Sequence, residues 1–236
     1  MTGVEVHTAQ ASYESVSLRQ VTGLCIRPGG TKLTDRAIDF CRFPSGARVL
    51  DVGCGTGATV EHLRTGTGLA AAGVDISQRL IAEGLVRNSD LPLAEGRAEA
   101  LPVGDEKLDG IFCECVLSLA AEPRRAVQEF RRVLRPGGYL IVSDLYLRRP
   151  AGDAHPTGFP EGIPVRGTMT RDTLETLLCA CGFTPCFWED HTPLLRELAA
   201  RLVLSGASLE GLCPGAVAGE RPGYYLLVAQ KINYGG

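Results

Sequence analysis

The sequence predicts an α/β fold, an open and mostly parallel β-sheet with helices on both faces. Short apolar segments of strand character alternate along the chain with segments of helical periodicity. Such alternation is typical of parallel strands joined by helical crossovers, which cover both faces of the sheet. A glycine-rich turn, residues 53–57, directly follows the first strand. Ligands of such sheets bind beyond the carboxyl ends of the strands, so this turn marks the predicted site.

The elements follow from these patterns in chain order. The predicted strands are residues 47–53, 69–75, 91–96, 108–114, 138–146, 183–190 and 224–232. The predicted helices are residues 31–41, a helix that begins at 57, and residues 77–88, 122–134, 170–181 and 192–202. Ser77 and Thr170 are expected to cap their helices, and Pro136-Gly137-Gly138 is expected to end the helix before it.

Length and composition indicate one domain. The chain has 236 residues, 44 % of them hydrophobic, and a net charge of −3, which argues against a nucleic-acid binder. The sequence contains neither an apolar run of membrane-spanning length nor the pattern of a secretory signal, and its nine cysteines suit reduced thiols. We expect a cytoplasmic monomer or homodimer that binds no membrane.

The domain divides into parts with different expected roles. Residues 46–146 form the ligand-binding core, and residues 1–45 form a lead-in that includes a lid. Residues 147–168 and 204–222 are rich in glycine and proline. These two stretches are expected to cover a substrate pocket or to form plain surface loops.

The turn itself favours one kind of ligand over another. Gly53, Gly55 and Ala58 satisfy the loose dinucleotide pattern, with Asp75 at the end of the next strand. Asp51, however, would repel a pyrophosphate and attract an ammonium or sulfonium group. A nicotinamide enzyme is therefore the less favoured interpretation.

Four motifs in order resemble one known family. VLDVGCGTG, GVDIS, GRAEALP and RRVLRPGGYLIVSD together resemble the class I S-adenosylmethionine-dependent methyltransferases, most closely the small-molecule "type 11" branch. The resemblance covers residues 46–146 well. It implies a Rossmann-like sheet of seven strands with an antiparallel last strand, and S-adenosylmethionine as cofactor.

The resemblance also assigns roles to individual residues. Asp75 would bind the ribose hydroxyls and Ile76 would contact the adenine, with Ala98 and Glu99 at the adenine edge. The residues that it places around the methionine part are Asp51, Gly53, Cys54, Gly55, Cys113 and Glu114. Arg97 stands where relatives often have Asp or Asn, and no histidine pair follows the fourth strand.

Methyl transfer is an in-line displacement, and a base is needed only if the nucleophile arrives protonated. The candidate catalytic residues are Asp144, His191 and Glu114. For His191 the alternative is a polar residue that caps the next helix. The candidate substrate contacts are Tyr13, Arg27 and Tyr146, and the acceptor is an unidentified small molecule.

Two further functions remain open at this point. An arsenite- or thiol-methylating enzyme would use Cys113 and Cys115, which are expected on one face of a strand. Cys179 and Cys181 should point to opposite sides of a helix, so these two and Cys186 do not form a site, and no metal is expected. A non-catalytic protein that binds S-adenosylmethionine as a sensor or assembly factor is the second alternative.

Overall fold

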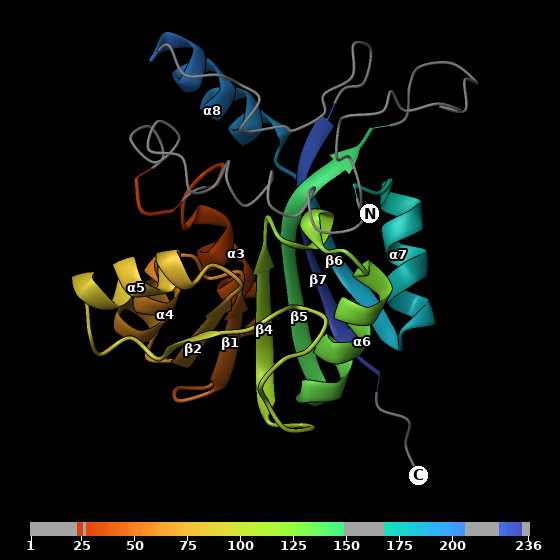
Figure 1. Cartoon of the computed structure of the whole chain (residues 1–236). Helices are drawn as coiled ribbons and strands as arrows, with labels where there is room; N and C mark the ends of the chain where they lie inside the picture. The colour runs from red at the N-terminus through yellow and green to blue at the C-terminus, as the bar shows by residue number, and fades with distance from the viewer. Residues whose placement is uncertain (1–22, 26, 149–167, 206–221, 233–236) are drawn as a thin grey trace.

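A single seven-stranded sheet organises the chain (Figure 1). The computed structural model describes residues 23–25, 27–148, 168–205 and 222–232. The strands are β1 (Arg48–Val52), β2 (Ala70–Asp75), β3 (Leu93–Glu95), β4 (Leu108–Glu114), β5 (Leu134–Leu147), β6 (Phe183–Asp190) and β7 (Pro222–Lys231). Their order across the sheet is β3-β2-β1-β4-β5-β7-β6. Neighbouring strands from β3 to β5 are parallel, whereas β7 runs antiparallel to both β5 and β6, so the predicted sheet is confirmed.

Helices cover both faces, as the alternating pattern predicts (Figure 1). They are α3 (Lys32–Cys41), α4 (Ala58–Thr67), α5 (Gln78–Arg87), the short 3-10 helix η1 (Leu117–Leu119), α6 (Pro123–Val133), α7 (Arg171–Ala180) and α8 (Thr192–Leu204). The expected caps form, because Ser77 Oγ accepts the Leu80 N–H at 3.2 Å and Thr170 Oγ1 accepts the Thr173 N–H at 3.3 Å.

Two apolar cores lie on opposite faces of the sheet. The α6–α7 core contains side chains of those two helices, among them Phe130 and Leu178. The α3–α4–α8 core contains Leu33, Leu63 and Leu195. Strands such as β1 and β7 contribute to both cores, because neighbouring residues of a strand point to opposite faces of the sheet.

One predicted boundary is wrong. The helix over 122–134 was expected to end at Pro136-Gly137-Gly138, but α6 ends at Val133 and β5 begins at Leu134. Leu134 is fully buried and pairs with Leu108 of β4, and the register then shifts before Gly110 pairs with Tyr139. Proline and the two glycines therefore lie in an irregular first part of the strand.

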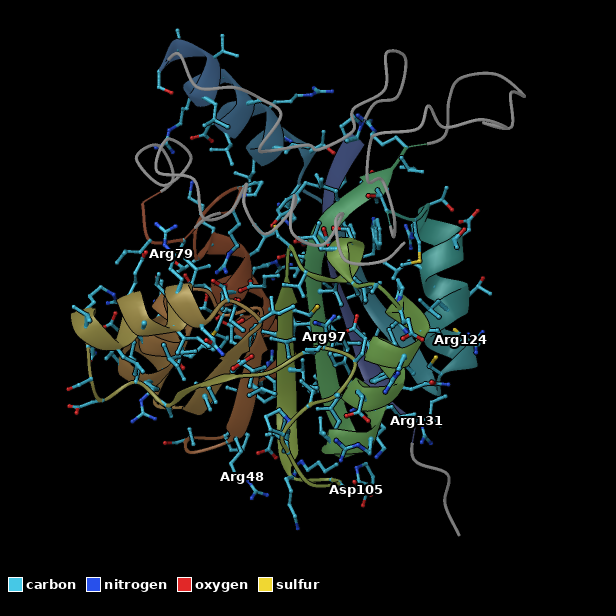
Figure 2. All side chains as sticks on the ribbon, viewed as in Figure 1. Arg48, Arg79, Arg97, Asp105, Arg124 and Arg131 are labelled. Carbon is cyan, nitrogen blue, oxygen red and sulfur yellow. The ribbon has the colours of Figure 1, made fainter. Side chains whose placement is uncertain are left out.

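The edge of the sheet where the parallel strands end is the predicted site. Figure 2 shows Arg48, at the start of β1, at the opposite edge from Arg79 in the first turn of α5. Helix α8 follows β6 directly and stands above the carboxyl edge in Figure 1. Most of the lead-in and of the two expected pocket covers lies outside the described residues. Within the described ranges, no helix is long and apolar enough to cross a bilayer.

Candidate functional site

Four carboxylates gather at the carboxyl edge of the sheet. Asp51 and Asp75 lie at the ends of β1 and β2, Glu114 ends β4, and Asp144 lies in β5. All four are buried, with exposed fractions between 1 % and 8 %. Burying an ionised carboxylate is costly unless an opposite charge or hydrogen-bond donors compensate it. This edge therefore favours a cationic ligand.

The glycine-rich turn follows β1 and leads into α4. Gly53, Gly55 and Gly57 have φ of 76°, 54° and 78°, in the left-handed region. The Gly53 N–H donates to the Val74 carbonyl at 2.8 Å, which fixes the turn to β2. A Cβ at position 53 would collide with the Val116 side chain. Glycine at 53 is thus required both by its φ and by the space available.

Asp75 holds the middle of this turn. Its Oδ2 accepts the Gly55 N–H at 2.7 Å, and its Oδ1 accepts the Ser77 N–H at 2.8 Å. The same carboxylate therefore fixes the turn and the start of α5. Each oxygen of a carboxylate can accept more than one hydrogen bond. Ile76, which lies between the end of β2 and the start of α5, is half-buried.

Arg27 is the residue whose position the sequence did not reveal. We expected it in a lid over the substrate, but the structure buries it against the first turn of α4. Its guanidinium donates to Thr59 Oγ1 at 2.9 Å, to Thr34 Oγ1 at 2.7 Å and to the Gly30 carbonyl at 2.7 Å. Its Nη1 also lies 2.6 Å from Glu114 Oε2. Arg27 thereby supplies a positive charge among the carboxylates of the site.

The buried charged groups at this edge shift one another's pKa values. Burial raises the pKa of Asp51 well above its usual range, and the nearby Glu114 raises it further. Burial also raises the pKa of Glu114, although Arg27 and the Thr34 hydroxyl oppose that change. Thr34 donates to Glu114 Oε1 at 2.9 Å. Among the described residues of the site, the buried carboxylates outnumber the single buried arginine, Arg27, which suits a ligand with positive charge.

Comparison with known proteins identifies the family. Residues 50–142 match the methyltransferase domain family. An O-methyltransferase from Pyrenophora dematioidea is 27 % identical over 216 residues, 85 % of this chain and 81 % of that protein. A demethylmenaquinone methyltransferase from Renibacterium salmoninarum is 35 % identical over 152 residues, 64 % of this chain and 60 % of that protein.

A solved structure has the same fold. It is phosphoethanolamine N-methyltransferase 2 of Haemonchus contortus in complex with phosphomonomethylethanolamine and S-adenosylhomocysteine, with a TM-score of 0.75 at 20 % identity. The likeness covers 96 % of this chain and 58 % of that one. The chain belongs to the class I S-adenosylmethionine-dependent methyltransferases. The predicted family, enzyme class and cofactor are confirmed.

The segment after β3 lies beside the start of α6 in this methyltransferase. Ala98 is buried, and Glu99 Oε1 accepts the Ala121 N–H at 3.0 Å. Arg97 lies 3.8 Å from Glu99 and is half-exposed. Glu99 therefore ties two loops together, and its contact with the adenine edge stays a prediction.

Asp144 has other partners within the methyltransferase. Its carboxylate accepts the Ser118 N–H at 2.8 Å, the Ser118 hydroxyl at 2.7 Å and the Leu145 N–H at 2.7 Å. Burial raises the pKa of Asp144, and the bonds from Ser118 oppose that change. The carboxylate thus fixes η1 to β5, a role that could not be expected from the sequence because Ser118 belongs to none of its motifs.

His191 lies at the far side of the sheet from the glycine-rich turn, whereas Tyr146 lies in β5, next to β4. Strand β6, which ends just before His191, is three strands from β4, about 14 Å at ordinary strand spacing. His191 Nε2 lies 3.0 Å from Glu189 Oε2, and its side chain makes no capping bond to α8. Asp190 instead accepts the Thr192 N–H at 2.7 Å and a bond from the Tyr146 hydroxyl at 3.1 Å. His191 thus occupies the N-cap position of α8, as the alternative predicts, but the side chain that accepts the capping bond is that of Asp190.

The expected pair of thiols on one strand face is wrong. Cys113 belongs to the α6–α7 core, whereas Cys115 packs against the α3–α4–α8 core. Cys115 has φ of 59°, which breaks the alternation of the strand. Burial raises the pKa of both thiols, so neither tends to form a thiolate.

The remaining cysteines agree with the sequence analysis. Cys179 is exposed and Cys181 is buried, so they point to opposite sides as expected. Among the described residues, no group of three or more His, Cys, Asp or Glu is placed to hold a metal ion. Cys54 is buried in the glycine-rich turn, and Tyr13 lies outside the described residues.

Proposed function

We propose that this enzyme transfers a methyl group from S-adenosylmethionine to a small-molecule acceptor by in-line displacement, with the cofactor lying along the ends of β2, β1 and β4. The observation that carries the placement is Asp75, whose carboxylate holds the Gly55 amide of the glycine-rich turn at 2.7 Å. The same carboxylate can accept the two ribose hydroxyls. Ile76 would then face the adenine, with Ala98 and Glu99 at its edge.

The methionine end of the cofactor matches the charges beyond β1 and β4. Its ammonium would lie near Asp51 and Glu114, whose buried carboxylates favour a cation. Its carboxylate would pair with Arg27, which the hydroxyls of Thr34 and Thr59 hold in place. Gly53, Cys54, Gly55 and Cys113 would border this end through backbone contacts.

We propose that catalysis rests on positioning rather than on a dedicated base. Each candidate base has other partners: Glu114 pairs with Arg27, Asp144 holds Ser118, and His191 pairs with Glu189. The sulfonium already activates the methyl group, so the protein has mainly to align the nucleophile and exclude water. Tyr146 and the lead-in are the proposed contacts of the acceptor.

Calorimetric titration with S-adenosylhomocysteine, with NADH in parallel, tests the placement. We expect micromolar binding of the first and none of the second, and a loss of at least tenfold in affinity in Asp75→Ala. Transfer of a labelled methyl group to pooled small molecules then identifies the acceptor. Binding without transfer to any acceptor would instead favour the sensor. From the charge and composition of the chain we also propose a cytoplasmic location, with neither a nucleic acid nor a membrane as partner.

A further inference from the structure

Helix α5 touches the glycine-rich turn along its whole length. At its start, Asp75 joins the Gly55 N–H to the Ser77 N–H. Near its end, Arg87 Nη2 donates to the Thr56 carbonyl at 3.2 Å. In between, the backbone of Gly84 lies directly against Thr56. A helix that lies outside the recognised motifs, the nearest of which ends at Ser77, thus supports the turn.

Gly84 is where the two backbones come closest. A Cβ at this position would lie 2.5 Å from the Thr56 carbonyl oxygen and 2.9 Å from its carbon. Both are backbone atoms, so no side-chain rotation can relieve the contact. Gly84 is buried inside a regular helix and has no left-handed φ that would call for glycine. Alanine is the better helix former, so the close approach to the turn is the physical reason for glycine here.

Arg87 fixes the same carbonyl from another direction. Its Nη2 donates to the Thr56 oxygen while its Nη1 pairs with Glu61 of α4. Asn88 also donates to Glu61, at 2.9 Å. The Thr56 carbonyl is therefore held between Gly84 and Arg87, and the Arg87 side chain is itself held by α4. The amides of Gly55 and Gly57 flank Thr56, so their positions depend on these two residues.

We propose that Gly84 and Arg87 are positioning residues for the cofactor: they set the place of the glycine-rich turn without touching the ligand. The inference rests on the proposed placement of S-adenosylmethionine on that turn. A small shift of Thr56 displaces the glycine-rich turn, together with the Gly55 N–H that Asp75 holds, relative to the ligand. Misplacement of a binding group weakens binding even when every contacting residue is intact.

Gly84→Ala tests the inference, with Gly66→Ala as its matched control. Gly66 is also a helical glycine, but a Cβ there would meet only the His62 ring, at 3.6 Å. In calorimetric titrations with S-adenosylhomocysteine we expect Gly84→Ala to raise Kd at least tenfold and Gly66→Ala to change it less than twofold. In the methyl-transfer assay, Gly84→Ala should raise KM for S-adenosylmethionine more than it lowers kcat. Equal Kd values for Gly84→Ala and the native enzyme would overturn the proposal.

Arg87 provides a second test that does not alter the helix packing. We expect Arg87→Met to raise the Kd of S-adenosylhomocysteine about fivefold, and Arg87→Lys to raise it less because lysine keeps a donor and the charge. Arg64→Met is the control, since Arg64 donates to the Ala71 carbonyl at 3.3 Å, away from the turn. An unchanged Kd in Arg87→Met would remove Arg87 from the proposal.

The outcomes separate this inference from the placement of the cofactor. If the native protein binds S-adenosylhomocysteine and Asp75→Ala does not weaken it, the placement on the turn is wrong. If Asp75→Ala weakens binding but Gly84→Ala and Arg87→Met do not, the placement stands and the role of α5 is wrong. If Gly84→Ala does not fold, the comparison of Arg87→Met with Arg87→Lys and Arg64→Met decides.

Discussion

The guanidinium of Arg27 lies 2.6 Å from the carboxylate of Glu114, and both side chains are more than nine-tenths buried. This ion pair joins the turn before α3 to the end of β4, beside the first turn of α4. Although burial opposes it, the Glu114 carboxylate raises the pKa of Arg27, so the arginine stays charged. The pair has the charge pattern of an amino-acid zwitterion, which is the part of the cofactor proposed to bind there.

Arg27→Met should destabilise the free enzyme and abolish cofactor binding. Removing one partner leaves Glu114 buried and uncompensated, a change that costs about 3–5 kcal/mol of unfolding free energy. Urea denaturation measures this loss, and calorimetry with S-adenosylhomocysteine measures the binding. The double variant Arg27→Met, Glu114→Leu should recover part of the stability but not the binding.

Arg36→Met is the control for that prediction. Arg36 also pairs with a glutamate, Glu189, at 2.8 Å, but the pair is exposed. Exposed ion pairs contribute little, so its unfolding free energy and cofactor affinity should stay close to native. Comparable losses in both arginine variants would show that burial at Arg27 has no special role.

Because Asp51 is buried, we expect cofactor binding to release protons. Because burial raises its pKa, Asp51 stays protonated in the free enzyme to a higher pH than an ordinary carboxyl. The ligand's ammonium favours the ionised form and so lowers this pKa on binding. Affinity for S-adenosylhomocysteine should therefore rise with pH until Asp51 is ionised in the free enzyme, and then level off.

Titrations over a pH series, in two buffers of different ionisation enthalpy, count the released protons. The asparagine in Asp51→Asn cannot ionise, so the affinity of this variant should depend less on pH in the lower part of the series. Glu114 and Asp75 remain and contribute a pH dependence of their own. A steep rise that survives in Asp51→Asn would assign the titration to another group of the site.

Most of the fold could be predicted because its signals are local. The strand and helix periods, Ser77 and Thr170 as caps, and the turn at 53–57 each depend on residues close in sequence. The boundary at Leu134 was missed because it depends on pairing with Leu108 of another strand. Tertiary contacts of this kind override the local signal of a proline and two glycines.

The site was predicted less completely, for the same reason. Asp75 and the glycines belong to motifs, whereas Arg27 gains its role from Glu114, Thr34 and Thr59, which only the fold brings together around it. The side to which Cys115 points follows from its φ of 59°, which no strand pattern indicates. Local periodicity therefore finds the strand ends, and packing decides which side chains meet there.

Because Cys113 and Cys115 lie in different cores, we predict that these two thiols do not form a site for arsenic. Arsenite prefers converging thiolates, but these two side chains lie in different cores and their pKa values are raised. We expect arsenite to leave the melting temperature unchanged, and Cys115→Ser to bind S-adenosylhomocysteine within twofold of native. Stabilisation by arsenite that disappears in Cys115→Ser would revive the thiol-methylating alternative.

Helix α8 packs against the turn before α3 through Leu194. A Cβ at Gly29 would lie 2.7 Å from Leu194 Cδ1, in the first turn of α8, and Gly29 has φ of 78°. Gly30, with φ of 59°, has no described atom within 4 Å of its Cβ position. Each Gly→Ala change costs about 1–2 kcal/mol for the left-handed backbone, but only Gly29→Ala adds a collision.

Gly29→Ala should therefore be less stable than Gly30→Ala, by about 1–3 kcal/mol for overpacking. Hydrogen exchange should be faster in residues 194–204 of Gly29→Ala alone. Leu194→Ala removes the colliding methyl group. The double variant Gly29→Ala, Leu194→Ala should therefore show hydrogen-exchange rates close to those of Leu194→Ala alone. Equal stability and equal exchange in the two glycine variants would mean that the turn carrying Arg27 does not support α8. A difference would show that the turn carrying Arg27, which is proposed to bind the cofactor, also supports α8 through the contact between Gly29 and Leu194.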